Sequence, residues 1–511
     1  METAASQSKI KRIDELGSIL EIYRAENKKI VYCHGVFDLL HIGHIRHLRQ
    51  ARGYADILVV TVTPDRFVDK GPGRPAFPEN LRAEALASLG DVDYVAINEW
   101  PTAEQPLRLL KPNFYAKGAE FKGIKSDYTG KIDRELRVVE EIGAEMVFTE
   151  DIVFSSSNLI NRFLSNRSDD VEEYLQLFRR RYSIEYVREL VEKMSSLKVL
   201  VVGDAILDDY CYCDSIGKSK KDPVLALQYR SNDLFIGGAL DVANQAAQYA
   251  GEVTLATVLG ERDSHDKFIR ERLRSNVQPH FVTKPGAPTQ VNRRILDAYS
   301  FTKLLEIYVT EGSDLPEEQD AEFCDWVKAE LDYYDVIIAA DFGYGTISDR
   351  LVNVLCEHAP HLAVNTQSSP SNQGFHTISR YPKADFICLG EHDFRLETRA
   401  SSQNLRPAMD ELTCRLSCKV LVVTCGRRGC LVSRREGSFV ACPAFTVSVV
   451  DRVGVGEAFF AITSLAAALG SEDELIGFIG NVVGALAVGV IGTQKPIEKD
   501  TLNKYITTLL K

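Results

Sequence analysis

The sequence predicts an α/β protein built from two doubly wound parallel-sheet domains. Short apolar runs, typical of strands buried on both faces, alternate with helical patterns along most of the chain. The 511 residues are too many for one ordinary core, and a highly charged segment separates two such alternating blocks. We expect a first domain over residues 28–165, a helical linker over 166–196 and a second domain over 197–511.

The individual elements follow from the apolar runs. In the first block, strands are predicted at residues 30–33, 57–62, 93–97, 114–116 and 145–148, and helices at 45–51 and 81–89. The charged segment 165–197 repeats apolar residues at helical spacing, which predicts helices with a solvated face. In the second block, strands are predicted at 198–203, 253–258, 336–340, 386–389 and 420–423.

The composition narrows the class of protein. Hydrophobic residues make up 45% of the chain and charged residues 26%, as in globular proteins. The formal net charge of −12 argues against a nucleic-acid partner, because nucleic acids select basic surfaces. No apolar run reaches the length of a membrane span, and the polar segment 1–12 lacks the core of a signal peptide, so a cytoplasmic protein is expected. The eleven cysteines include no Cys-x-x-Cys pair, which favours reduced, mostly buried thiols over disulfides or a metal site.

The most informative stretch is segment 33–44, with the sequence CHGVFDLLHIGH, between a predicted strand and a predicted helix. Its glycine turn places His41 and His44 at the start of that helix. Free backbone N–H groups and the positive end of the helix dipole favour anions there. Two imidazoles at this point can donate to phosphate oxygens as negative charge builds up on them, which predicts phosphate chemistry.

Other residues of the first block fit the same chemistry. Lys70 lies in a loop rich in glycine and proline, Lys117 and Gly118 follow a strand without an adjacent acid in the sequence, and Arg82 begins a helix. Three serines, Ser155, Ser156 and Ser157, precede an apolar helix. Serines at a helix start are ordinary N-caps, and a lone loop lysine is commonly a surface charge. Together with the histidine turn, they favour a site for a triphosphate.

Taken together, these motifs resemble the cytidylyltransferase-like nucleotidyltransferases, over about residues 28–165. The resemblance implies a Rossmann-like domain in which a phosphate oxygen of the acceptor attacks the α-phosphate of a nucleoside triphosphate. Magnesium pyrophosphate leaves, so Mg²⁺ is the expected cofactor. Such transfers depend on positioning and charge stabilisation more than on covalent help from the protein.

The resemblance also implies roles for the individual residues. His41 and His44 would stabilise the transition state, Lys70 and Lys117 would neutralise phosphate charge, and the three serines would hold the triphosphate. Arg82 would contact the nucleotide or the acceptor, and Asp38 would orient the turn. The full set of nucleotide-binding candidates in this domain is Gly35, Val36, Phe37, Asp38, Arg82, Lys117, Gly118, Ser155, Ser156 and Ser157.

The second block resembles the ribokinase-like sugar kinases, over about residues 197–508. Asp204 and Asp208 at the end of its first strand would accept hydrogen bonds from sugar hydroxyls, and Gly237 and Gly238 would let the backbone approach a sugar. The resemblance assigns the nucleotide side to Thr424, Gly426, Gly429, Gly454 and Gly456. In the family, segment 451–457 supplies an anion hole from glycine N–H groups and an aspartate base.

This chain departs from the kinase pattern at several positions. The base position carries Glu457, whose pKa is ordinarily similar to that of aspartate but whose carboxylate reaches about one ångström further. Asp241 stands where the heptose-kinase relatives usually carry asparagine, and segments 389–393 and 365–367 match the family weakly. Two interpretations follow: an active kinase that uses Glu457, or a degenerate domain that binds ligands or mediates dimerisation.

The pairing of the two domains resembles the bifunctional ADP-heptose synthases, although their domain order is reversed here. The resemblance implies an enzyme that makes a nucleotide sugar of the ADP-heptose type from a nucleoside triphosphate and a sugar 1-phosphate. Its second domain would phosphorylate the sugar. The alternative is a cytidylyltransferase for another sugar or polyol phosphate with a degenerate kinase-like domain. Either ATP or CTP is the expected nucleotide substrate, and both resemblances imply a homo-oligomer.

Overall fold

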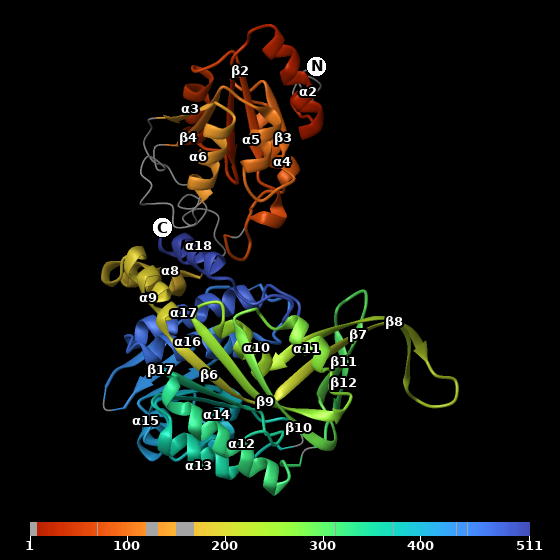
Figure 1. The fold of residues 1–511 in the computed structure, drawn as a ribbon, viewed down its shortest axis with the longest axis vertical. Coiled ribbons are helices and arrows are strands. Elements are labelled where there is room, and N and C mark those ends of the chain that lie inside the picture. Colours follow the sequence, from red (N-terminus) through yellow and green to blue (C-terminus); the bar gives the residue numbers. More distant parts are fainter. Residues whose placement is uncertain are drawn as a thin grey trace. The chain divides into compact units, whose positions relative to one another are not determined.

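The computed structural model describes residues 8–68, 70–118, 131–149, 168–311, 313–370, 372–435, 437–446 and 448–511. The chain divides into two compact units, Met1–Asn166 with Thr507–Lys511, and Arg167–Ile506. Each unit has its own sheet and its own core (Figure 1). The predicted fold class is confirmed in both units, because helices flank a mostly parallel sheet in each.

The first unit is a five-stranded parallel sheet in the order β3-β2-β1-β4-β5. Its strands are β1 (Ile30–Gly35), β2 (Ile57–Val62), β3 (Tyr94–Ile97), β4 (Phe114–Gly118) and β5 (Glu145–Thr149). All five strands match the predicted apolar runs within a few residues. The strands that start the predicted histidine and lysine motifs, β1 and β4, are neighbours at the centre of the sheet.

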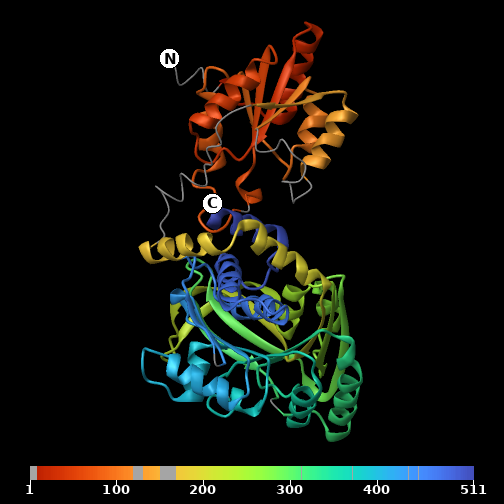
Figure 2. The ribbon, with the colours of Figure 1, turned by 90° about the vertical axis from the view of Figure 1, so that its left-hand side faces the viewer.

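Helices cover both faces of this sheet (Figure 2). They are α2 (Ile13–Ala25), α3 (Ile42–Arg52), α4 (Glu79–Ala87), α5 (Glu104–Leu110) and α6 (Lys131–Glu141). The side chains of Val31 and Cys33 on β1 pack with α3 and α4. The intervening Tyr32 points to the other face and packs with α2, α5 and α6. The alternating directions of strand side chains explain why the central strands are apolar throughout.

The second unit contains a nine-stranded sheet in the order β10-β9-β6-β13-β14-β15-β16-β17-β18. Its strands are β6 (Lys198–Gly203), β9 (Glu252–Arg262), β10 (Val277–Pro288), β13 (Val336–Asp341), β14 (Leu362–Thr366), β15 (Phe386–Gly390), β16 (Val420–Thr424), β17 (Cys430–Arg434) and β18 (Phe439–Cys442). The pairs are parallel except for β16–β17 and β17–β18, which are antiparallel. Each predicted strand of this block is present.

Two sets of helices cover this larger sheet. One core cluster joins the sheet to α12 (Glu317–Glu330), α13 (Asp349–His358) and α15 (Arg406–Arg415). On the sheet also pack α10 (Ala239–Ala246), α16 (Val455–Ala468) and α17 (Asp473–Ala487). The remaining helices are α8 (Asp169–Arg181), α9 (Ile184–Lys193), α11 (Asp266–Arg272), α14 (Glu391–Thr398) and α18 (Lys499–Leu510).

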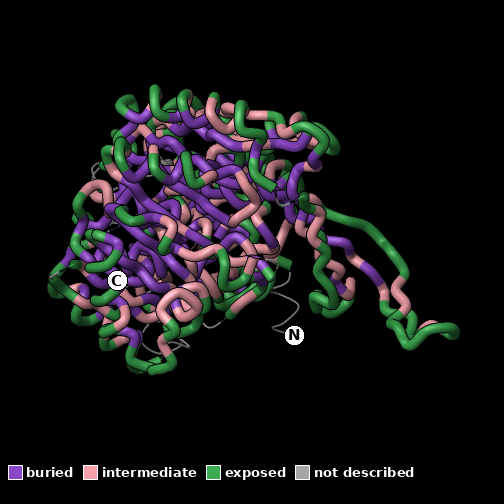
Figure 3. Tube along the Cα trace, turned by 90° about the horizontal axis from the view of Figure 1, so that it is seen from below, coloured by how far each residue is buried: buried purple, intermediate pink, exposed green. Residues whose placement is uncertain are grey.

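A second, four-stranded sheet was not predicted from the sequence. Its order is β12-β11-β7-β8, with β7 (Ala205–Lys218), β8 (Leu225–Gly238), β11 (Gln290–Asp297) and β12 (Lys303–Val309). The far end of the β7–β8 hairpin projects from the rest of the unit and is largely exposed (Figures 1 and 3). Apolar residues on exposed strands, such as Leu225 and Leu305, carry no buried periodicity, which explains why the sequence did not reveal this sheet.

Two expectations about composition can be compared with the fold. Each of the eleven cysteines is a free thiol and most of them are buried, as predicted. Among the helices of the described ranges, none is both long enough and apolar enough to cross a membrane.

The charged segment after the first unit forms the predicted helices, α8 and α9. The apolar side of α8 buries Phe178, whose ring stacks on that of Phe478 in α17 with 4.1 Å between ring centroids. This segment is therefore packed onto the second unit. The predicted limits of the two domains and of the linker stay predictions.

We expect Phe178→Ala to lower the free energy of unfolding of the second unit by about 3 kcal/mol, because it removes a fully buried ring and leaves a cavity. Chemical denaturation of the full chain measures this change. The neighbouring Leu177→Ala is the control, since Leu177 is 44% exposed and should change the free energy by less than about 0.5 kcal/mol. Equal effects of the two substitutions would contradict the packing of α8.

Candidate active sites

The turn after β1 brings the two predicted histidines together. His41 is the N-cap of α3, and its Nδ1 accepts a hydrogen bond from the backbone N–H of Gly43 at 3.1 Å. The rings of His41 and His44 stack with 4.0 Å between centroids, and the ring of Phe37 meets that of His44 edge-on at 5.3 Å. The stacked pair therefore stands at the helix terminus, where anions are favoured.

Burial favours the neutral forms of these two imidazoles. It lowers the pKa of His44 to about 3, helped by the neighbouring His41, and it also lowers the pKa of His41. A third residue, His47, which the sequence analysis did not single out, has its pKa lowered by burial to about 4. A polyphosphate placed here would favour the charged forms, so its binding should take up protons.

Asp38 holds the loop that carries Lys70. Its carboxylate is buried, accepts hydrogen bonds from the backbone N–H groups of Ala76 (2.6 Å) and Phe77 (3.2 Å), and pairs with Arg74 at 3.3 Å. These contacts tie the loop to the turn after β1, and the orienting role of Asp38 in catalysis stays a prediction. Burial lowers the pKa of Lys70 to about 8, against the attraction of Asp38, and Lys70 in turn lowers the pKa of His44. The contacts of Asp38 thus hold the loop of Lys70 against the turn that carries the histidines.

Arg82 does not lie where the sequence analysis expected. It sits in the first turn of α4 rather than at its start, and it is 1% exposed. Its Nε donates to the carbonyl of Phe77 at 2.8 Å, and its two terminal nitrogens donate to protein oxygens on either side of the site. Those acceptors are the carbonyl oxygens of Val36 and Thr63 and the carboxylate of Asp65. The guanidinium therefore connects the turn after β1, the segment after β2 and the loop before α4.

Lys117 corrects a second expectation. The sequence shows no acid beside it, but Glu135 of α6 approaches its Nζ at 2.8 Å, and both side chains are largely buried. Although burial opposes ionisation, Lys117 lowers the pKa of Glu135. Glu135 also accepts a hydrogen bond from the hydroxyl of Tyr115 at 3.0 Å. Only the folded chain brings α6 against β4, so local sequence carried no signal for this pair.

The remaining candidates of the first unit are Gly118 at the end of β4 and the three serines. His47 Nδ1 lies 2.7 Å from the hydroxyl of Thr149, which donates to the carbonyl of Lys117 at 3.4 Å, and these contacts place the end of β4 next to α3. Ser155, Ser156 and Ser157 lie outside the described residues. Among the residues that the structure describes, no group of three or more His, Cys, Asp or Glu side chains is arranged to hold a metal ion.

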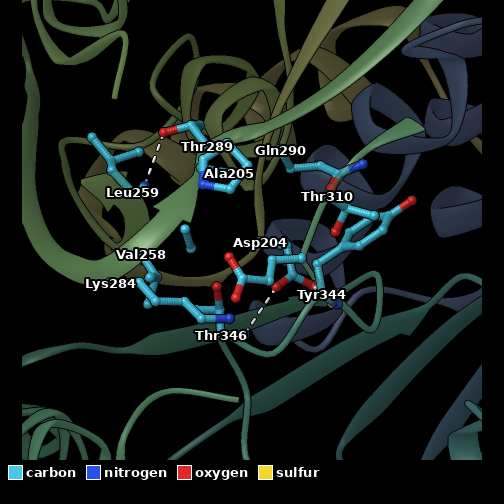
Figure 4. Close-up of a pocket in the computed structure, with 14 residues that line it drawn as sticks. Asp204, Ala205, Val258, Leu259, Lys284, Thr289, Gln290, Thr310, Tyr344 and Thr346 are labelled. Atoms are coloured by element: carbon cyan, nitrogen blue, oxygen red, sulfur yellow. Dashed lines mark hydrogen bonds between the residues drawn. The ribbon is translucent and has the colours of Figure 1, made fainter. Parts of the chain in front are cut away.

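In the second unit, Asp204 organises a loop. One carboxylate oxygen accepts from the backbone N–H groups of Phe342 (2.9 Å) and Tyr344 (3.3 Å), and the other accepts from Thr346 at 3.0 Å. Figure 4 shows Asp204 at the centre of a pocket, with Lys284 on one side and Tyr344 on the other. Most of the hydrogen-bonding capacity of Asp204 thus holds the pocket wall, whereas the sequence analysis assigned it to a sugar.

Asp208 lies next to the two predicted glycines. It forms a largely buried ion pair with Arg294 of β11. A Cβ on Gly237 would stand 2.5 Å from Asp208 Oδ2, and one on Gly238, which has φ +58°, would stand 2.5 Å from the carbonyl oxygen of Asp204. The chain can pass this closely only because both residues lack a side chain. Helix α10 begins immediately afterwards, at Ala239.

Glu457 occupies the first turn of α16, whose N-cap is Gly454 with φ +81°. A Cβ on Gly454 would meet Thr493 at 2.5 Å, whereas one on Gly456 would meet open space. The pKa of Glu457 is raised to about 7, chiefly by burial and also by the nearby Asp208, while a backbone hydrogen bond and Arg294 oppose the rise. The predicted base is therefore poised to accept a proton near neutral pH.

Asp451, at the start of the same segment, is a structural anchor. It accepts hydrogen bonds from the hydroxyl of Tyr210 (2.5 Å), from Lys303 (2.7 Å) and from the backbone N–H of Gly492 (2.9 Å). These contacts hold in place the chain segment that leads into Gly454. The sequence motif includes Asp451, but its partners come from distant strands and could not be inferred.

The glycine turn on the predicted nucleotide side follows β16, which ends at Thr424. Gly426 has φ +58° and Gly429 φ +88°, and a Cβ on Gly429 would stand 1.9 Å from the carbonyl oxygen of Cys442. The turn therefore requires glycine at Gly429. Its Arg428 pairs with Glu391 at the start of α14 at 2.5 Å. The binding roles of this turn stay predictions.

Fold and site together define a two-unit α/β protein, with a nucleotidyltransferase-like first unit and a carbohydrate-kinase-like second unit. The family model described as pfkB family carbohydrate kinase matches residues 196–500, and the model described as Cytidylyltransferase-like matches residues 32–163. Because the first match covers more than half of the chain, the chain belongs to the pfkB family of carbohydrate kinases.

Similar curated proteins bear the name Bifunctional protein HldE. The one from Geobacter metallireducens is 38% identical over 137 residues, which cover 25% of this chain and 28% of that protein. The one from Pelobacter propionicus is 39% identical over 168 residues, 32% of this chain and 33% of that protein. This chain therefore spans about a third of the length of these relatives. The Koribacter versatilis protein is 27% identical over 60% of this chain and 63% of its own length.

Solved structures show the same fold in the second unit. The Y23D mutant of phosphofructokinase-2 from Escherichia coli superposes with a TM-score of 0.51 at 17% sequence identity, and covers 62% of this chain and 100% of its own. The tetrameric inhibited form of that enzyme gives 0.51 at 15% identity, with the same coverage. At these identities the likeness concerns the fold alone.

The low pKa of His44 predicts how stability depends on pH. The unfolded histidine binds a proton below about pH 6.5, whereas the native one stays neutral down to about pH 3. Acidification through this window therefore destabilises the first unit, and we expect His44→Asn to weaken the dependence. Thermal unfolding of both proteins between pH 4 and 7 measures it.

The exposed His392 provides the matched control, as His392→Asn should leave the pH dependence unchanged. If His44→Asn and the original chain lost stability in parallel on acidification, the burial of His44 would not be the cause.

Proposed function

We propose that the first unit is a nucleotidyltransferase that forms a nucleotide sugar, of the ADP-heptose type, from a nucleoside triphosphate and a sugar 1-phosphate. The observation that carries the proposal is the stacked pair of His41 and His44 at the N-terminus of α3, beside Lys70. The relatives named Bifunctional protein HldE support the same type of reaction.

In this reaction an oxygen of the sugar phosphate attacks the α-phosphorus of the triphosphate as the bond to pyrophosphate breaks. Negative charge grows on the phosphoryl oxygens, and the two imidazoles and the free N–H groups of α3 stabilise it. Lys70 and Lys117 neutralise the leaving pyrophosphate, and Lys117 exchanges its contact with Glu135 for phosphate. Mg²⁺ enters bound to the triphosphate, whose oxygens are its preferred ligands.

We propose further that the second unit phosphorylates the sugar before nucleotidyl transfer. Glu457 accepts the proton of the attacking hydroxyl, while the N–H groups near Gly454 and Gly456 receive the charge of the transferred phosphoryl group. A pKa near 7 suits this base, and membership of the pfkB family supports the assignment. The pocket beside Asp204 is the candidate place for the sugar.

One observation favours a second candidate function. Glu457 and Asp241 both depart from the expected residues at the centre of the kinase site, and both are shifted toward the protonated form. If these changes removed catalysis, the second unit would bind ligand or mediate dimerisation, and the first unit would act as a cytidylyltransferase on another sugar or polyol phosphate. A cytoplasmic homo-oligomer is proposed in either case.

The first test concerns the histidine pair. We expect the full chain to release pyrophosphate from ATP with magnesium and heptose 1-phosphate, and His44→Ala to lower kcat by about 10²–10³-fold because the charge-stabilising donor is lost. A coupled phosphate assay measures the rate, and His392→Ala is the control for an exposed histidine of the same chain.

Unchanged pyrophosphate release in His44→Ala would contradict the role of the pair. Release with CTP and a different sugar or polyol phosphate, but not with ATP and heptose 1-phosphate, would favour the alternative.

A second test concerns Glu457. We expect Glu457→Gln to abolish sugar-dependent conversion of ATP to ADP, because the amide cannot take the hydroxyl proton, and to leave pyrophosphate release unchanged. We expect Glu457→Asp to retract the base and cost on the order of a hundredfold in kcat. Steady-state assays with heptose 7-phosphate measure both variants. Absence of turnover in the original chain, with ATP and sugar still bound, would instead identify a degenerate kinase unit.

A further inference from the structure

Two carboxyl groups of the second unit, those of Asp241 and Glu457, form no ion pair among the described residues. Asp241 of α10 is 2% exposed, and its Oδ1 accepts a hydrogen bond from Gln245 at 3.2 Å. Its Oδ2 is buried and has no hydrogen-bond partner among the described residues. Burying a carboxyl oxygen without a hydrogen-bond donor costs free energy, so the burial of Asp241 Oδ2 needs an explanation.

The oxygen without a partner lies beside the start of the helix that carries the candidate base. A Cβ built on Gly454 would lie 3.6 Å from Asp241 Oδ2, and Gly454 is the N-cap of the helix whose first turn contains Glu457. Helix α10 packs directly on α16. Burial and, after it, the charge of Glu457 raise the pKa of Asp241 well above its usual value.

The cations near these two carboxyl groups form ion pairs with other acidic side chains. Arg294 of β11 pairs with Asp208 of β7 and, at 2.8 Å, with Glu306 of β12. Lys303 pairs with Asp451.

On β13, which packs against both helices, the acid at the strand end is Asp341. Its partners are His376, Arg380 and Tyr381. A proton held by one of the two carboxyls would reduce the charge of the pair from two to one.

We propose that Asp241 is a positioning residue that keeps its proton while Glu457 is ionised, so that Oδ2 donates a hydrogen bond toward Glu457. This inference rests on the proposed kinase reaction. The pair then carries one negative charge, on the carboxylate that accepts the hydroxyl proton as the new O–P bond forms and the bond to the departing nucleoside diphosphate breaks. Asp241 keeps its own proton through the step and holds the longer glutamate side chain in place.

The proposal predicts a bell-shaped pH profile for the kinase reaction. Activity rises as Glu457 ionises near pH 7, and falls about tenfold per pH unit once Asp241 loses its proton. We expect Asp241→Asn to keep the acidic limb and to lose the alkaline fall, because the amide donates at every pH. A purely structural role would lower kcat equally at all pH values and leave the fall in place, and that result would overturn the proposal.

A second readout does not depend on activity. Since the native pair holds protons that unfolded carboxyls release near pH 4, the free energy of unfolding should decrease as pH rises through 7 and above. Asp241→Asn and Glu457→Gln should each reduce this slope. Asp209→Asn is the matched control, because the buried Asp209 is instead paired with Arg293 at 2.7 Å.

The two readouts separate two kinds of failure. Parallel pH slopes in the original chain and both pair variants would overturn the shared proton. Loss of the slope in both pair variants, together with no kinase turnover in the original chain, would support the proton pair and remove the proposed kinase function. If Asp241→Asn does not fold, the slope of Glu457→Gln decides.

Discussion

A buried carboxylate at the end of a parallel strand, satisfied by backbone N–H groups of a distant loop, holds each candidate site together. In the first unit Asp38 binds the N–H groups of Ala76 and Phe77, and in the second unit Asp204 binds those of the loop after β13. A buried charge must be paired. If either loop moved away, its carboxylate would lose the N–H donors that stabilise it. The positions of the Lys70 loop and of the wall of the pocket beside Asp204 depend on this constraint.

The two units differ in the charged side chains that they place around Asp38 and Asp204. The first unit collects imidazoles and lysines at the helix terminus and keeps the histidines neutral by burial until an anion arrives. The second unit collects carboxyls: Asp208 forms an ion pair with Arg294, whereas Asp241 and Glu457 form none among the described residues. The first arrangement suits stabilisation of growing negative charge, and the second suits proton removal from a hydroxyl. The pairing fits a chain that phosphorylates a sugar and then activates it.

The sequence predicted what depends on local pattern. Buried parallel strands are apolar throughout, so all strands of the first sheet were found, and the histidine turn was recognised because its spacing fixes it at a helix start. Contacts between elements that are far apart in the sequence produce no local pattern from which they could be predicted. The pairing of Lys117 with Glu135, the enclosure of Arg82 and the antiparallel sheet of β7, β8, β11 and β12 all depend on how elements meet in the folded chain.

The central claim is that this chain makes a nucleotide sugar. Its most direct test is to incubate the full chain with magnesium, each of the four common nucleoside triphosphates and a panel of sugar 1-phosphates, and to identify the products by mass spectrometry. The account predicts an ADP-sugar from ATP and heptose 1-phosphate. Failure to form any nucleotide sugar, with triphosphate still bound at the histidine turn, would contradict it.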